Sequence, residues 1–254
     1  MASVDYSALD DIGISMNAFY PRKNWSQAPL GAVDLAVRVD DDISLSSRFF
    51  PAAKAAPTIL FFYGNGETAN DYNNIAPLYT RIGVNFLVSD YRGYGRSDGW
   101  PSFTSMLADS HKVLDFTKTM LADEDFPVKL YVMGRSMGRH SAFELAANRS
   151  GELDGVIIES GRPILGNFVS SLPPRQAEAM EAAYAAKVGC ISIPSLVIHG
   201  ELDELAPVEQ AVRMHHAFQS SEKRLLTIPG AGHNDLLYHG LNEYFAAIKD
   251  FTGA

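Results

Sequence analysis

Short apolar runs rich in β-branched and aromatic residues alternate along this chain with stretches in which apolar residues recur at helical spacing. Strands that are apolar almost throughout and are separated by helices are typical of a parallel sheet covered on both faces. We therefore expect an α/β fold. The predicted strands are 58–63, 84–89, 128–133, 156–158, 195–198 and 224–228, and the predicted helices are 71–82, 104–122, 136–148, 175–187, 207–218 and 234–251.

Upstream of these elements, residues 33–39 and 43–49 partly alternate between apolar and polar side chains. The acidic turn Asp40-Asp41-Asp42 joins them, which predicts an antiparallel hairpin at the N-terminal edge of the sheet. No change of composition marks a boundary, so we expect a single domain over 1–254. Residues 1–40 carry no recognisable chemistry, and we expect an extra strand or a partner surface there.

Composition limits the possible partners. The chain has 254 residues, 46% of them hydrophobic, and 30 acidic against 21 basic side chains give a net charge of −9. Such a charge repels nucleic acid and anionic membranes. No apolar run is long enough for a signal peptide or a membrane span, and Cys190 is the single cysteine. We expect a soluble, cytoplasmic protein without nucleic-acid or membrane partners, and its oligomeric state stays open.

A candidate nucleophile follows the predicted strand 128–133. There the chain reads Gly134-Arg135-Ser136-Met137-Gly138 and continues into a predicted helix. A tight strand-to-helix turn needs small residues on both sides and projects the serine hydroxyl outward. The alternative is a glycine-rich turn with an incidental serine.

A serine hydroxyl needs a base and a group that orients the base. Asp203 follows the predicted strand 195–198, and His233 follows the last predicted strand. The order Ser136, Asp203, His233 is that of the α/β-hydrolases. Glu201 and Glu204 are the competing acids, and Asp203 could instead serve as a turn carboxylate.

The remaining histidines show no zinc-binding spacing, so we expect no metal site. His199, at a predicted strand end, is interpreted as a buried turn residue rather than the base. His140 lies one turn after the nucleophile beside Arg139, and its role stays open.

Acyl transfer also needs two donors aimed at the developing oxyanion. The backbone amides of Asn65 and Met137 are the candidates, because both follow predicted strands. The segment 64–69 also matches the dinucleotide pattern G-x-G-x-x-A, with Asp90 closing the next strand. That alternative leaves the serine, aspartate and histidine unexplained.

Taken together, these motifs resemble the α/β-hydrolase superfamily over about residues 43–251, and within it the lidless Bem46-like branch, which is related to the serine aminopeptidases and depalmitoylating hydrolases. Residues 90–97 (D-Y-R-G-Y-G-R-S) and 63–67 (Y-G-N-G-E) are similar to loops of that branch. The resemblance implies that Ser136 attacks, His233 relays the proton and Asp203 orients it. Tyr63 stands where the family usually has histidine.

Little chain separates 160 from 194, which predicts a minimal lid and an open site. The candidates for the substrate pocket are Tyr63, Arg92, Tyr94, Leu165 and Phe168. For Arg92 the alternative to a pocket role is a structural pairing with a carboxylate, and for the apolar candidates the alternative is simple packing in the core.

The sequence therefore predicts a serine hydrolase without a cofactor. Its expected substrate is a small-molecule acyl ester or thioester, cleaved through an acyl-Ser136 intermediate. The alternatives are a thioesterase or peptidase of the same fold, or a receptor that keeps the fold without catalysis.

Overall fold

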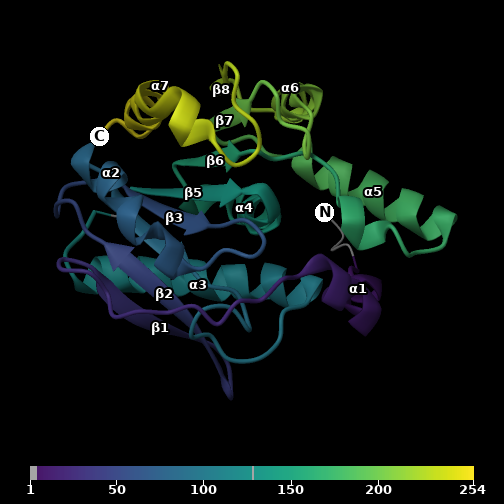
Figure 1. Ribbon diagram of the computed structural model, residues 1–254, viewed down its shortest axis with the longest axis horizontal. Coiled ribbons are helices and arrows are strands. Elements are labelled where there is room, and N and C mark those ends of the chain that lie inside the picture. Colours follow the sequence, from purple (N-terminus) through teal and green to yellow (C-terminus); the bar gives the residue numbers. More distant parts are fainter. Residues whose placement is uncertain (1–4, 128) are drawn as a thin grey trace.

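The computed structural model describes residues 5–127 and 129–254, and its centre is one eight-stranded sheet (Figure 1). The strands lie in the order β1-β2-β4-β3-β5-β6-β7-β8. They are β1 (Val33–Asp40), β2 (Ile43–Phe50), β3 (Thr58–Phe62), β4 (Asn85–Ser89), β5 (Leu130–Arg135), β6 (Gly155–Glu159), β7 (Ser195–Gly200) and β8 (Lys223–Ile228).

The pairing confirms the predicted sheet. β1 pairs antiparallel with β2, and β2 pairs antiparallel with β4, whereas all other pairs are parallel. The predicted start of the fifth strand at Val128 lies outside the described residues. At its C-terminal end β5 extends two residues beyond the predicted strand, to Arg135, which pairs with Glu159 of β6. Every residue of β3, β4, β6 and β7 is buried, as expected for strands covered on both faces.

Helices cover both faces of the sheet, as predicted. α2 (Ala76–Arg81) and α7 (Leu236–Thr252) meet through the rings of Tyr79 and Phe245, and α3 (Phe103–Asp123) packs against α4 (Arg139–Asn148). The predicted helix 71–82 is divided into η2 (Ala69–Asn74) and α2, because Pro77 has no backbone N–H to continue a helix. The helices are α1 (Ile12–Ala18), α2 (Ala76–Arg81), α3 (Phe103–Asp123), α4 (Arg139–Asn148), α5 (Pro174–Val188), α6 (Val208–Ala217) and α7 (Leu236–Thr252).

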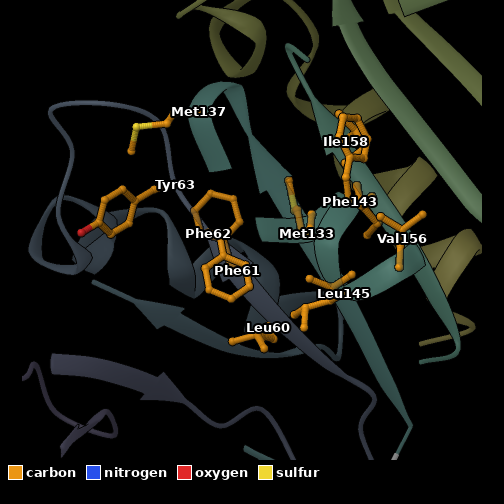
Figure 2. Packing of buried hydrophobic residues seen from close by; sticks show 14 of the residues in the cluster. Leu60, Phe61, Phe62, Tyr63, Met133, Met137, Phe143, Leu145, Val156 and Ile158 are labelled. Carbon is orange, nitrogen blue, oxygen red and sulfur yellow. The ribbon is translucent and has the colours of Figure 1, made fainter. Parts of the chain in front are cut away.

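The core joins the central strands to the helix that follows the candidate nucleophile. Figure 2 shows side chains of β3, β5 and β6 beside Phe143 and Leu145 of α4, and all of these are buried. Burial of each such side chain contributes about 1.5–3 kcal/mol to folding. Because α4 is held against β5 and β6 in this way, the turn that joins β5 to α4 has little freedom.

The N-terminal segment forms helices rather than an extra strand. η1 (Ser7–Asp10) and α1 lie beyond the end toward which β3 and β5 point, near α5 (Figure 1). The ring of Phe19 packs edge-on against Phe168 of η5 (Gly166–Val169), with centroids 5.4 Å apart. The segment between β6 and β7 holds only η5 and α5. The N-terminal helices η1 and α1 therefore add to the cover at the carboxyl end of the sheet. None of the helices in the described ranges is long and apolar enough to cross a membrane.

The turn between β5 and α4 is tight. Ser136 has φ +49°, a left-handed conformation that is strained for a residue with a side chain. A Cβ atom at Gly138 would lie 1.9 Å from the carbonyl oxygen of Phe62, and one at Gly134 would lie 2.6 Å from the carbonyl oxygen of Gly138. Both positions therefore require glycine: Gly138 because the turn touches the backbone of β3, and Gly134 because the chain folds back on its own backbone at Gly138 and Arg139.

We expect Gly138→Ala to lower the free energy of unfolding by about 3 kcal/mol, the upper end for overpacking, because the added methyl meets backbone that cannot move aside. Urea unfolding measures this. Gly151→Ala is the matched control, since a Cβ at Gly151 meets nothing within 4 Å. Equal stability of the two variants would contradict the proposed backbone contact.

Candidate active site

Three side chains from three loops meet at the carboxyl ends of the strands. Ser136 follows β5, Asp203 follows β7, and His233 follows β8. The Oγ atom of Ser136 lies 2.8 Å from Nε2 of His233, and Nδ1 of His233 lies 2.8 Å from Oδ2 of Asp203. The residues that the sequence singles out as nucleophile, base and orienting acid are thus joined by hydrogen bonds.

Asp203 is held as a carboxylate. Its side chain is fully buried, and Oδ1 accepts the N–H groups of Leu205 at 2.9 Å and Ala206 at 2.7 Å. Burial alone would raise the pKa of Asp203, but the hydrogen bonds from His233 and from the Ala206 amide outweigh it and leave the pKa below its ordinary value. The carboxylate therefore stays charged where it orients the imidazole.

The neighbouring acids do not take this place. Oε2 of Glu201 accepts the N–H of Gly230 at 2.9 Å, and Glu204 is exposed. His199 is fully buried, and its Nε2 atom lies 2.6 Å from the carbonyl oxygen of Ala206. Burial lowers the pKa of His199, so it remains a neutral residue that supports the turn around Asp203.

The two predicted oxyanion donors lie in the loop after β3 and in the turn after β5. Within the described residues, the backbone N–H of Asn65 has no hydrogen-bond partner. The N–H of Met137 lies in the first turn of η3 (Ser136–Gly138), where N–H groups have no acceptor within the helix. Gly64, before Asn65, donates its N–H to Oε2 of Glu67 at 3.0 Å, which fixes the shape of this loop.

The side chain of Asn65 makes contacts of its own, and the sequence does not reveal them. Its Nδ2 donates to the carbonyl oxygen of Ala18 at 2.7 Å. Its Oδ1 accepts the N–H of Tyr20 at 2.9 Å and the hydroxyl of Tyr94 at 2.7 Å. These hydrogen bonds connect the end of α1 to the loop that carries a candidate oxyanion donor.

Three predicted pocket residues are engaged in internal contacts. Tyr63 is fully buried and donates its hydroxyl to Asp90 at 2.7 Å. The hydroxyl of the buried Tyr94 is bound to Asn65, and Arg92 forms a bidentate ion pair with Asp109 at 2.7 and 2.8 Å. For Arg92, the ion pair is the carboxylate pairing that was the structural alternative.

The two apolar pocket candidates, Leu165 and Phe168, are buried, and Phe168 packs against the N-terminal segment. The ring of Phe168 packs against Phe103 at 4.7 Å and His140 at 5.3 Å, in addition to Phe19. Phe168 is therefore covered, because α1, an N-terminal helix that the sequence did not indicate, packs on η5.

The dinucleotide alternative finds no support in the geometry. Asp90, its candidate ribose ligand, is buried, and its Oδ1 already accepts Tyr63 and the N–H of Ala69 at 2.8 Å. A carboxylate used in this way is not available to a ribose hydroxyl. In the part of the chain that the structure describes, no group of three or more His, Cys, Asp or Glu side chains could hold a metal ion.

Comparison with known proteins identifies similar sequences and folds. A family model described as "Serine aminopeptidase, S33" matches residues 53–162. Protein bem46 of Schizosaccharomyces pombe is 25% identical over 240 residues, which covers 85% of this chain and 75% of that protein. The mouse alpha/beta hydrolase domain-containing protein 17C is 28% identical over 240 residues, 91% of this chain and 71% of that protein.

Among solved structures, the esterase Pf2001 of Pyrococcus furiosus superimposes with a TM-score of 0.72 at 18% identity, covering 92% of this chain and 98% of the esterase. At this identity the likeness concerns the fold. The fold is thus that of the α/β-hydrolases, and the chain is similar to the matched family and to relatives of the Bem46-like branch.

Proposed function

We propose that the protein is a serine hydrolase that cleaves carboxylic esters through an acyl-Ser136 intermediate. One observation carries this proposal: Ser136 Oγ lies 2.8 Å from His233 Nε2, and His233 Nδ1 lies 2.8 Å from Asp203 Oδ2. A hydroxyl becomes a competent nucleophile when a base within hydrogen-bond reach takes its proton and a third group orients that base.

In the first half-reaction, Ser136 Oγ attacks the carbonyl carbon of the ester while its proton passes to Nε2 of His233. The carbonyl oxygen becomes an oxyanion that the N–H groups of Asn65 and Met137 stabilise. The tetrahedral intermediate then collapses, the bond to the leaving alcohol breaks, and His233 returns the proton to that alcohol. The acyl group remains on Ser136.

In the second half-reaction, His233 takes a proton from water, and the resulting hydroxide attacks the acyl carbon. A second oxyanion forms and collapses, Ser136 regains its proton from His233, and the carboxylic acid leaves. Throughout the cycle the negative charge of Asp203 stabilises the imidazolium. The chemistry draws only on side chains, backbone amides and water.

The leaving group is proposed to be an alcohol in the first place, with a thiol second and an amine third. The esterase among the structural relatives supports the ester, and the aminopeptidase name of the matched family keeps the amide among the candidates. One serine, histidine and aspartate arrangement can serve all three, so the substrate depends on the surroundings of Ser136.

Labelling with a fluorophosphonate tests the proposal without a known substrate. Intact mass spectrometry should show one adduct on the wild-type protein, because His233 activates Ser136, and no adduct on Ser136→Ala. Circular dichroism checks that both are folded. Absence of an adduct on folded wild-type protein would reject the hydrolase and favour a receptor that keeps the fold.

A second test concerns the acid. Asp203→Asn should lower kcat for an aryl ester by about 10⁴-fold, the loss typical of a triad aspartate, because the amide stabilises the wrong tautomer of His233. Glu204→Gln is the matched control, since Glu204 is exposed and lies one residue away. Steady-state kinetics compares them. A loss of comparable size in Glu204→Gln would show that Asp203 is misassigned.

A further inference from the structure

One buried guanidinium joins the loops around the candidate nucleophile. The side chain of Arg135, the residue before Ser136, is only 12% exposed. Its guanidinium pairs with Glu67 in the loop after β3 and, at 2.9 Å, with Glu159 at the end of β6. It also reaches the loop after β8, where Nη2 donates to Oδ1 of Asn234 at 2.8 Å and to the carbonyl oxygen of His233 at 3.2 Å.

The two carboxylates are themselves held in place. Oε2 of Glu67 accepts the hydroxyl of Tyr72 at 2.6 Å as well as the Gly64 amide, and Oε2 of Glu159 accepts the hydroxyl of Tyr244 at 2.5 Å. Burial by itself lowers the pKa of Arg135, but Glu67 and Glu159 outweigh this effect and raise it. The guanidinium is therefore a permanent charge at a fixed position.

The carbonyl of His233 has a second donor. The hydroxyl of Ser160 lies 3.3 Å from it. Ser160 has φ +49°, and such a strained backbone persists only where the surrounding structure imposes it. The peptide group of His233 is thus held from two sides, which restricts where its imidazole can lie.

We propose that Arg135 is a positioning residue that places the imidazole of His233 against Ser136. This inference rests on the proposed function, since it assigns Arg135 a task in the same reaction. Arg135 acts through the backbone of His233 and the side chain of Asn234, not by contact with the substrate. A competing explanation is that Arg135 only neutralises Glu67 and Glu159.

The two explanations differ at Asn234, which is exposed and accepts from Arg135 through its side chain. Neutralisation of the two carboxylates does not involve Asn234. Positioning does involve it, because this contact fixes the residue that follows His233.

Access to the guanidinium makes a further test possible. A cleft of about 490 Å³ is lined by Arg135, Glu67 and Glu159 together with side chains of η2, α2 and α7. Small solutes can therefore approach the space that the arginine side chain occupies. A planar cation that replaces a deleted guanidinium would restore the hydrogen bonds to Asn234 and His233.

The first experiment compares Asn234→Ala with Asn234→Asp in the full-length protein. A misplacement of about 1 Å can cost about 10²-fold in rate. We expect Asn234→Ala to lower kcat for an aryl ester by up to this factor while KM changes little, and Asn234→Asp, which keeps the acceptor oxygen, to retain most of the activity. Equal kcat values for wild type and Asn234→Ala would overturn the inference.

The second experiment uses Arg135→Ala, with circular dichroism to establish folding. Its rate of fluorophosphonate labelling should fall by about 10²-fold and should rise again in dilute methylguanidinium, but not in urea of equal concentration. Arg149→Ala is the matched control, because Arg149 pairs with Asp115 and Glu152 on another surface. Unchanged labelling of folded Arg135→Ala would reject the inference.

Should Arg135→Ala fail to fold, because Glu67 and Glu159 are left unpaired, the Asn234 variants still decide the question. The proposed function is tested separately by the wild-type protein. If the wild type is neither labelled nor active, the hydrolase itself fails. If the wild type reacts but the Asn234 and Arg135 variants react equally well, only the positioning role fails.

Discussion

The structure around the candidate site depends on the close approach of the turn after β5 to the end of β3. Gly138 lies so near the carbonyl oxygen of Phe62 that no side chain fits between them. This contact holds the end of β3, which leads into the loop with Asn65, against the turn that carries Ser136. It also explains why Ser136 adopts a strained conformation, because the chain must reverse within a few residues to enter α4.

Charged groups at this site are buried, and each is satisfied by several partners. Asp203 accepts two backbone amides and His233, while Arg135 spans two carboxylates and the loop after β8. A buried charge without partners would cost several kcal/mol, so these networks also limit the movement of the loops they join. The N-terminal segment adds a further restraint through the side chain of Asn65. The same contacts that satisfy charge therefore determine where the reacting groups lie.

Several features could be predicted from the sequence because their signals are local. The elbow around Ser136 is a run of five residues, and the strands before Asp203 and His233 are marked by apolar side chains. The partners of Arg135 could not be predicted, because Glu67 and Asn234 lie 68 and 99 positions away. No periodicity relates positions so far apart.

By itself, the sequence determined the α/β alternation, the antiparallel edge and the order of serine, aspartate and histidine along the chain. Only the tertiary structure decided that α1 covers the end of the sheet, and that Tyr63, Tyr94 and Arg92 have internal partners. The physical reason lies in the range of the interactions. Hydrophobic periodicity and turn chemistry act between near neighbours, whereas the partner of a buried polar group is selected by the packing of segments distant in the chain.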